Sequence, residues 1–385
     1  MKINKYGSHQ IFDDDIETVI KVLKSDFLTQ GNLVTKFENE FTKKENSKFS
    51  IAVNSGTSAL HLACLALNLK ENDIFWTTPI SFVASANCGI MVGAKVDFVD
   101  IDIDNGNISI ESLKKKLSLA KKNNQLPKVI IIVHYSGNAV DIKEIYKLSK
   151  KYKFKIIEDG CHALGGKVHN TNIGSCKYSH ITTFSFHPVK NITSAEGGMI
   201  TTNNLKIKKS LELMRTHGIK KFSNYYKYKN KIKKCWFYEQ RILGYNYRLS
   251  DIHAALGLNQ LKRLNYFVKK RNKLAKIYEE NINQNKYLLL TKNNFSYSGM
   301  HILVIRIIDK KLSRAKIIKF LKSKNIGYQI HYQPIHLQPF YKKFGFKSGN
   351  FPIAEKFAKE VLTLPLHTLL EEKEILKIIE YLNKL

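Results

Sequence analysis

The chain has 385 residues, of which 43% are hydrophobic, so it is long enough to bury a large core and to form two domains. It contains no uninterrupted apolar run of about eighteen residues, which argues against a membrane-spanning helix. Its formal net charge is +31, but the excess is nearly all lysine spread from end to end. This pattern indicates a compositional bias rather than the clustered arginines of a nucleic-acid-binding surface.

Short strands alternate with helical patterns through the first two-thirds of the chain. Several of the strands, such as VIIIVHY, are apolar throughout, as expected for strands that are covered on both faces. Because strands that alternate with helices usually pair in parallel, we expect an α/β fold with a mostly parallel central sheet. The predicted strands span residues 50–54, 73–79, 94–101, 129–135, 153–160, 180–186 and 198–203.

The pattern changes after about residue 247, where longer helices and fewer strands follow. We therefore expect a large domain of residues 1–246 and a smaller C-terminal α+β domain of residues 247–385. The polar, basic and aromatic segment 222–241 is predicted to be a long loop. In the smaller domain the sequence predicts one long helix from about 250 to 280, a strand within 293–307, a helix at 313–327, a Gln/His/Pro-rich loop at 329–341 and a helix at 371–385.

The N-terminus and the cysteines indicate where the protein resides. The first twenty residues carry an acidic cluster and no apolar segment, unlike a secretory signal, so we expect a cytoplasmic protein. The five cysteines are odd in number, widely scattered and without a CxxC pair. They predict neither a disulfide framework nor a zinc site, and we expect reduced thiols and no bound metal.

One lysine lies in an unusual setting. Residues 185–198 read SFHPVKNITSAEGG, so Lys190 lies between a Ser-Phe-His-Pro turn and a run of small residues that ends in Gly-Gly. The ordinary interpretation of any lysine in this chain is solvent exposure. A lysine that only solubilises a surface does not need such a rigid local sequence, which instead favours a fixed amine.

A second stretch, NSGTSAL (54–60), follows a predicted strand and opens a helix. Ser55, Gly56, Thr57 and Ser58 offer small side chains, hydroxyls and the free N–H groups of a helix N-terminus, which together suit a phosphate. An ordinary N-cap gives a similar pattern, so this stretch is weak evidence by itself.

Two further stretches also begin where a predicted strand ends. In IIEDGCHALG, Asp159 ends a buried strand and His162 follows three residues later. In TTPISFVASAN, Phe82 opens a predicted helix just past a strand. Taken singly, a helix-capping aspartate, a core histidine and a core phenylalanine are the more ordinary interpretations. In an α/β sheet, however, ligands bind where strands end, so the stretches together predict one site.

Together with one earlier motif and two later ones, these stretches resemble the DegT/DnrJ/EryC1/StrS family of sugar aminotransferases. This family uses pyridoxal 5'-phosphate on the type I, aspartate aminotransferase-like fold. The resemblance covers nearly the whole chain in six ordered matches, which are FLTQGNLVTKFENEF, NSGTSAL, IEDGCHALG, SFHPVKNITSAEGG, GYNYRLSDIHAALGLNQL and IGYQIHYQPIHLQPFY.

The resemblance implies a role for each matching residue. Lys190 would be the catalytic lysine, which binds the cofactor covalently and needs a neutral amine, against a free pKa of roughly 10.4. Asp159 would pair with the pyridine nitrogen, Phe82 would stack on the ring and His162 would bond near the ring hydroxyl. Asn246 would reach the phosphate from the other subunit of a homodimer with shared sites. The implied cofactor-binding set is Gly56, Thr57, Ser58, Phe82, Asp159, His162, Ser185, Lys190 and Asn246.

The resemblance also implies a substrate class. Several details are similar to the branch that transfers an amino group from L-glutamate to the C4 ketone of a UDP-linked 4-keto-6-deoxy-N-acetyl hexose, which gives UDP-4-amino-4,6-dideoxy-N-acetyl-β-L-altrosamine for pseudaminic acid. His134 is either near this site or a core histidine at a strand end. The residues implied to contact the sugar nucleotide are Tyr6, Phe27, Leu28, Thr29, Gln30, Arg248, Gln329, Ile330, His331 and Tyr332.

Alternative functions would predict different sequence features. Another C4 aminotransferase, of the UDP-4-amino-arabinose, perosamine or bacillosamine type, keeps every cofactor residue and differs only in the sugar pocket. A sugar dehydratase of this fold replaces the lysine by histidine, which Lys190 argues against. A regulator built on the fold would predict a helix-turn-helix or clustered arginines, and neither is found in the sequence.

Overall fold

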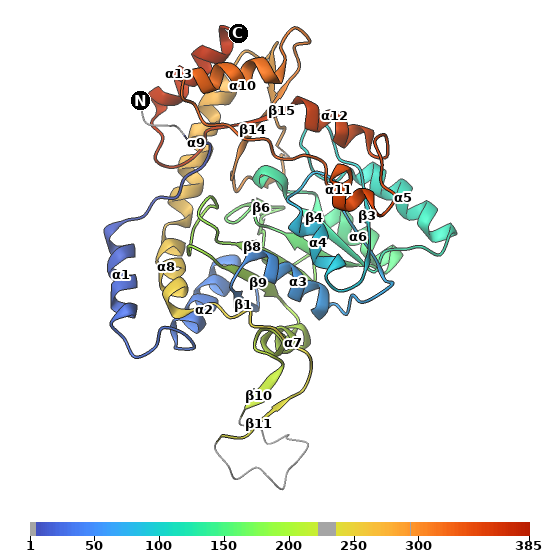
Figure 1. The fold of residues 1–385 in the computed structure, drawn as a ribbon, viewed down its shortest axis with the longest axis vertical. Coiled ribbons are helices and arrows are strands. Elements are labelled where there is room, and N and C mark those ends of the chain that lie inside the picture. The colour runs from blue at the N-terminus through green and yellow to red at the C-terminus, as the bar shows by residue number, and fades with distance from the viewer. Residues whose placement is uncertain (1–4, 222–235, 293) are drawn as a thin grey trace.

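A seven-stranded sheet lies at the centre of the computed structural model, which describes residues 5–221, 236–292 and 294–385 (Figure 1). Its strands are β1 (Phe49–Val53), β2 (Ile74–Thr77), β3 (Lys95–Phe98), β4 (Val129–Val133), β5 (Lys155–Asp159), β8 (Ile181–Ser185) and β9 (Gly198–Thr202). They lie in the order β1-β9-β8-β5-β4-β2-β3. Every residue of β4 and β9 is buried, and the apolar sequence of β4 predicts this.

The sheet is mostly parallel, which confirms the predicted fold class. The neighbours β8, β5, β4, β2 and β3 pair in parallel, whereas β9 is antiparallel to both β1 and β8. The reversal arises because residues 186–197 connect β8 to β9 without a crossover helix. The same short connection carries Lys190. All the other strands end at one edge of the sheet, which brings the residues that follow them together.

Helices cover both faces of the sheet. One core joins α3 (Gly56–Ala66), α4 (Ala84–Ile90) and α7 (Leu205–Arg215) to one face. The core on the other face includes residues of α2 (Leu33–Glu45), α5 (Ile110–Lys122), α6 (Ile142–Tyr152) and α8 (Asp251–Lys262), and α1 (Asp13–Leu23) packs against α8. Side chains cap several of these helices at their first turn, including Ser55 at α3, Ser109 at α5 and Asp141 at α6.

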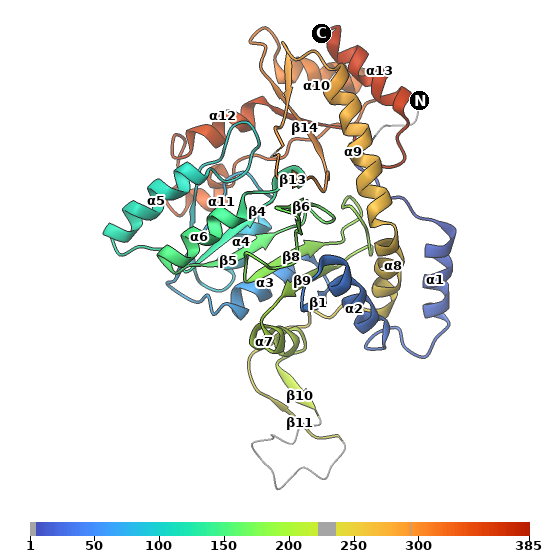
Figure 2. The same cartoon turned by 180° about the vertical axis from the view of Figure 1, so that it is seen from behind.

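A second core forms near the C-terminus. It contains the antiparallel strands β12 (Tyr287–Leu289), β14 (Leu303–Ile307) and β15 (Val361–Leu364), with the helices α10 (Arg314–Ser323) and α13 (Glu372–Asn383). Helix α9 (Leu264–Asn281) runs from α8 toward these helices in both views (Figures 1 and 2). Its residue Val268 belongs to the core of the central sheet, whereas Leu274 belongs to the second core. We place the change of core within α9, and the division at residues 246 and 247 stays a prediction.

Four predicted elements differ in the structure. The expected loop 329–341 contains the 3-10 turn η3 (Ile335–Leu337) and the start of helix α11 (Pro339–Lys342). The single helix expected from about 250 to 280 is two helices, α8 and α9, which meet at Arg263. The strand expected within 293–307 is two strands, β13 (Ser296–Tyr297) and β14. Part of the expected loop 222–241 is strand β11 (Tyr238–Gln240), which pairs with β10 (Ile219–Lys221), and residues 222–235 lie outside the described residues.

The remaining elements are short or lie near the C-terminus. Strand β6 (Lys167–Val168) pairs with β7 (Thr171–Asn172) and with β13. The others are the 3-10 turns η1 (Tyr135–Gly137) and η3 (Ile335–Leu337) and the helices α11 (Pro339–Lys342) and α12 (Pro352–Glu360).

Two findings concern the chain as a whole. Within the described residues, no helix is both long enough and apolar enough to cross a lipid bilayer. The four described cysteines, Cys64, Cys88, Cys161 and Cys176, are free thiols, and Cys235 lies outside the described residues.

Candidate active site

A cavity of about 530 Å³ opens where the strands of the central sheet end. Its walls come from the residues that follow β1, β2, β5 and β8 and from the loop that leads to η3. Most of the predicted site residues meet here. The predicted residues that line the cavity are Tyr6, Gly56, Thr57, Phe82, Asp159, His162, Ser185, Lys190, Gln329, Ile330, His331 and Tyr332.

Lys190 projects from a connection that is held in place on both sides. Its backbone N–H donates to the carbonyl of His187 at 2.8 Å, which closes the predicted turn. The buried side chain of Asn191 donates to the carbonyls of Leu164 at 2.8 Å and Gly299 at 2.6 Å. The lysine is therefore fixed by contacts from two distant parts of the chain.

The environment of Lys190 favours the neutral amine. Burial lowers the pKa of Lys190, and the nearby Cys161 and Asp159 offset only part of this effect, so the pKa lies below its ordinary value. A lowered pKa increases the fraction of uncharged amine, which is the form that attacks a carbonyl group.

Asp159, the last residue of β5, is buried beside this lysine. Its Oδ2 accepts a 2.6 Å hydrogen bond from the hydroxyl of Ser85, and its Oδ1 accepts a 3.1 Å bond from the N–H of Cys161. The Ser85 hydroxyl also lies 2.8 Å from that of Ser81. The carboxylate is thus held in one orientation and is suited to face a positively charged group.

The start of α3 and the end of β8 lie against each other. Ser55 caps α3 by accepting a 3.1 Å hydrogen bond from the N–H of Ser58. A Cβ added to Gly56 would lie only 2.8 Å from Cβ of Ser185, so a glycine is required for this close approach. The result is a helix N-terminus with hydroxyls beside it, which attracts a phosphate through the N–H groups and the helix dipole.

Two imidazoles lie side by side on the cavity wall. The ring centroids of His162 and His301 are 4.4 Å apart, and His301 Nε2 lies 3.0 Å from the carbonyl oxygen of Val189. Burial lowers the pKa of both histidines well below the ordinary value, and the charge of Lys190 adds to the effect. Nδ1 of His162 is buried and has no hydrogen-bond partner among the described residues, so it is available to a ligand.

Aromatic side chains form the remaining walls. Tyr6 and His331 are in edge contact at 5.4 Å between centroids, and Phe82 lies 6.4 Å from Tyr332. Phe82 is 58% exposed, which leaves one side of its ring open to stack on a planar ligand.

Other predicted residues lie outside this cavity in the single chain. The hydroxyl of Ser58 donates to Asn54 within the start of α3. Phe27 to Gln30 are exposed, and the carbonyl of Leu28 accepts a hydrogen bond from the N–H of Asp251. Asn246 is exposed and Arg248 partly exposed, and neither lines the cavity. Their contacts with cofactor or sugar stay predictions, and that of Asn246 invokes a partner subunit.

The cavity also contains residues that the sequence did not indicate. Ser85 lies in the predicted TTPISFVASAN stretch, so its motif was found but its role was not. His301 lies in an apolar stretch before β14 and gave no signal as a site residue. The unpredicted lining residues are Leu60, Ser81, Ala84, Ser85, Val133, Cys161, His187, Val189, Glu196 and His301, whereas Ser55, which also lines the cavity, belongs to the predicted phosphate-binding stretch.

These residues fit pyridoxal 5'-phosphate. The start of α3 and Ser185 suit its phosphate, and the buried carboxylate of Asp159 suits a protonated pyridine nitrogen. The free Nδ1 of His162 suits a ring substituent, and the amine of Lys190, whose pKa is lowered by burial, suits the aldehyde. Each part of the cofactor therefore has a chemically matched group in one cavity.

Comparison with known proteins gives a consistent assignment. The model of the DegT/DnrJ/EryC1/StrS aminotransferase family matches residues 9–383. The chain is 38% identical over 365 residues to the UDP-4-amino-4,6-dideoxy-N-acetyl-beta-L-altrosamine transaminase of Campylobacter jejuni subsp. jejuni serotype O:2, covering 94% of this chain and 92% of the relative.

Two solved structures have the same fold. Helicobacter pylori PseC, an aminotransferase involved in the biosynthesis of pseudoaminic acid, superposes with a TM-score of 0.89 at 31% identity, covering 100% of this chain and 99% of PseC. The PLP form of the putative sugar aminotransferase Spr1654 from Streptococcus pneumoniae superposes with a TM-score of 0.88 at 27% identity, covering 98% and 97%. The chain therefore belongs to the DegT/DnrJ/EryC1/StrS aminotransferase family and is a pyridoxal-phosphate-dependent sugar aminotransferase.

Proposed function

We propose that this enzyme transfers an amino group from L-glutamate to the C4 ketone of a UDP-linked 4-keto-6-deoxy-N-acetyl hexose, giving UDP-4-amino-4,6-dideoxy-N-acetyl-β-L-altrosamine. The observation that carries the proposal is the 38% identity to the Campylobacter altrosamine transaminase along nearly the whole chain. The cavity supports it because a cofactor-sized cradle lies next to an aromatic and imidazole wall, which suits a sugar ring.

Each side chain has a defined task in this reaction. Bound pyridoxal phosphate supplies the electron-withdrawing ring that carries the amino group from donor to acceptor. Asp159 would hold the ring nitrogen in its protonated state, and Phe82 would stack on the ring face. Lys190 Nζ would move a proton to and from the reacting carbon, and burial, which lowers the pKa of Lys190, increases the fraction of neutral amine that can accept that proton.

The sugar side of the cavity is assigned to the loop before η3 and to Tyr6. Gln329, His331 and Tyr332 line the cavity together with Tyr6, and His331 is largely buried. Burial lowers the pKa of His331 to about 3, so its imidazole is neutral and acts as a polar but uncharged contact. Such contacts suit hydroxyl and N-acetyl groups better than they suit a carboxylate.

The active unit is a homodimer in this proposal. Phe27 to Gln30, Asn246 and Arg248 lie outside the cavity of their own chain, and they are exposed or partly exposed. Exposed residues of this kind are free to reach the cavity of a partner subunit across a two-fold interface.

A half-reaction tests the substrate. The purified protein is loaded with pyridoxamine phosphate and mixed either with the ketone precursor of the L-altrosamine product or with its C5 epimer. Return of the pyridoxal absorbance with the L-altro precursor alone supports the proposal, with the Lys190→Ala variant as the inactive control. If the pyridoxal absorbance returns with the epimer alone, the enzyme is a sugar aminotransferase of another pathway. If it returns with neither sugar, the proposed substrate class is wrong.

A further inference from the structure

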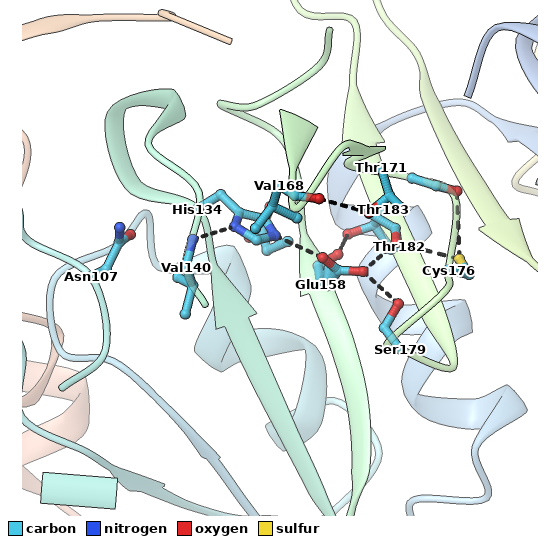
Figure 3. A network of polar contacts seen from close by, with 12 residues as sticks. Asn107, His134, Val140, Glu158, Val168, Thr171, Cys176, Ser179, Thr182 and Thr183 are labelled. Atoms are coloured by element: carbon cyan, nitrogen blue, oxygen red, sulfur yellow. Dashed lines mark hydrogen bonds and ion pairs between the residues drawn. The ribbon is translucent and has the colours of Figure 1, made fainter. Parts of the chain in front are cut away.

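A hydrogen-bonded network lies beneath Asp159, on the opposite face of the sheet. Glu158 and Asp159 are consecutive in β5, so their side chains point to opposite faces. Asp159 lines the cavity, whereas Glu158 is 3% exposed and points into the network shown in Figure 3. A buried carboxylate is costly unless it is fully hydrogen-bonded, so its partners need an explanation.

Three side chains donate hydrogen bonds to Glu158. Its Oε2 lies 2.9 Å from Nε2 of His134. Its Oε1 accepts from the hydroxyls of Ser179 at 2.5 Å and Thr182 at 3.0 Å. Burial raises the pKa of Glu158, but its hydrogen bond and electrostatic attraction to His134, together with the hydrogen bonds from Ser179 and Thr182, outweigh burial and leave the pKa below the usual value. The group is therefore a carboxylate in the folded protein.

The tautomer of His134 follows from its second contact. The N–H of Val140 donates to Nδ1 of His134 at 3.1 Å, so Nδ1 carries no hydrogen. Nε2 then carries the hydrogen that is donated to Glu158. The imidazole is thus locked between one acceptor and one donor, and the carboxylate cannot rotate without breaking a bond.

This network joins the three strands whose ends form the floor of the cavity. His134 follows β4, Glu158 belongs to β5, and Thr182 belongs to β8, where it is directly opposite Glu158. The cavity-lining neighbours on the same strands are Val133, Asp159 and Ser185. The network therefore fixes the spacing of the strands at the point where they present these residues.

The backbone completes the link to Asp159. The N–H of His134 donates to the carbonyl of Asp159 at 3.2 Å, and the N–H of Gly160 donates to the carbonyl of Thr183 at 2.9 Å. The side chain of Asp159 is thus held by the hydroxyl of Ser85. Its backbone is held by hydrogen bonds to the neighbouring strands, which the Glu158 network joins. A shift of β5 would move the carboxylate of Asp159 directly.

We propose that His134 and Glu158 are positioning residues for transamination, and that their hydrogen bond sets the place of the Asp159 carboxylate relative to the cofactor ring. This inference rests on the proposed role of Asp159. The network does not touch the cavity, so its effect on the cofactor is transmitted through β5.

Two substitutions of His134 separate positioning from stability. In His134→Gln the side-chain amide nitrogen replaces Nε2 and still donates to Glu158, whereas in His134→Asn the shorter amide replaces Nδ1 and meets only Val140. We expect His134→Asn to lower kcat and the affinity of the apo-protein for pyridoxal phosphate by about tenfold, because small misplacements of catalytic groups cost this much or more. The absorption spectrum of the bound cofactor shifts in the same variant, whereas His134→Gln stays within about twofold of the wild type.

A matched control lies elsewhere in the chain. His336 also contacts a carboxylate, with Nε2 3.0 Å from Oε1 of Glu355, but neither residue lines the cavity. His336→Asn is expected to lower the melting temperature without shifting the cofactor spectrum. If His134→Asn yields no folded protein, the isosteric Thr182→Val removes one bond to Glu158 and gives a smaller shift in the same direction.

The outcomes distinguish the two proposals. If His134→Asn and His134→Gln lose stability equally and neither changes the cofactor spectrum, the pair is structural and the positioning inference fails. If Asp159→Asn itself leaves the cofactor spectrum and kcat unchanged, the proposed role of Asp159 fails instead.

Discussion

The hydroxyl of Tyr332 lies 3.1 Å from Nε2 of His162, although 170 positions separate the two residues in the chain. Tyr332 belongs to the loop before η3, and His162 follows β5 of the central sheet. The contact therefore joins the proposed sugar side of the cavity to the proposed cofactor side. It also occupies one ring nitrogen of His162 and leaves Nδ1 for a ligand.

Removal of this hydroxyl tests the connection. In Tyr332→Phe, Nε2 of His162 loses its partner, and we expect kcat to fall by about tenfold because a buried polar group is left unpaired in the site. Steady-state kinetics measure the effect. The control is Tyr341→Phe, which removes a buried hydroxyl bonded to Asn87 away from the cavity and should leave kcat unchanged. Equal losses in both variants would contradict a specific role for Tyr332.

Shared active sites predict complementation between inactive subunits. In a heterodimer of Lys190→Ala and Asn246→Ala chains, one site carries both substitutions and the other carries neither. After unfolding and refolding of an equal mixture, we expect about a quarter of the wild-type activity, because half of the dimers then have one intact site. Activity that never exceeds that of the separate variants would place Asn246 outside the partner's site.

Gly56 should be required for cofactor binding more than for folding. In Gly56→Ala the added Cβ meets Ser185 at 2.8 Å and narrows the phosphate cradle, so we expect about tenfold weaker binding of pyridoxal phosphate. Alanine is the better helix former, so the loss cannot come from a weaker α3. Titration of the apo-protein measures it. The control is Gly7→Ala, whose added Cβ would meet Val189 only at an ordinary 3.9 Å.

The buried carboxyl of Glu45 predicts how stability depends on pH. Burial raises the pKa of Glu45, the last residue of α2, from 4.5 to about 8. Between these values the folded chain holds a proton that the unfolded chain has lost, so the free energy of unfolding falls as pH rises. The expected slope is about 1 kcal/mol per pH unit from pH 5 to 8.

Denaturant unfolding at several pH values measures this slope. Glu45→Gln removes the ionisable group, so its stability relative to the wild type should increase with pH. Glu40→Gln, at an exposed position of the same helix, should leave the slope unchanged. A wild-type slope that Glu45→Gln does not reduce would show that other groups cause it.

The local sequence determined the elements and the main motifs. The strands of the central sheet lie within or close to their predicted ranges because most are short runs rich in apolar and β-branched residues. The start of α3 was predicted because Ser55 and Gly56 act within one helical turn. The motifs around Asp159 and Lys190 were found for the same reason, since each consists of neighbouring residues at the end of a strand.

Contacts between distant segments decided the rest. The helical sequence pattern continues through Arg263, but the structure has two separate helices that meet at this residue. The guanidinium carbon of Arg263 lies 4.5 Å from the centroid of the Phe12 ring, and its Nη1 donates to Oδ1 of Asp15 at 3.3 Å. Nothing in the sequence near Arg263 shows that α1 lies beside it. The hydrogen-bond partners of His162 and Glu158 could not be predicted for the same reason, since Tyr332 and His134 are distant from them in the sequence.

The physical reason is the range of the interactions. Helix caps, strand alternation and Gly-rich turns act over a few residues, so the sequence alone determined the fold class and the main cofactor motifs. Which side chains share a cavity depends on strand order and on packing across the sheet. Only the tertiary structure therefore placed His301 and Ser85 at the site and Glu158 beneath it, and left Phe27 to Gln30 outside the cavity of their own chain.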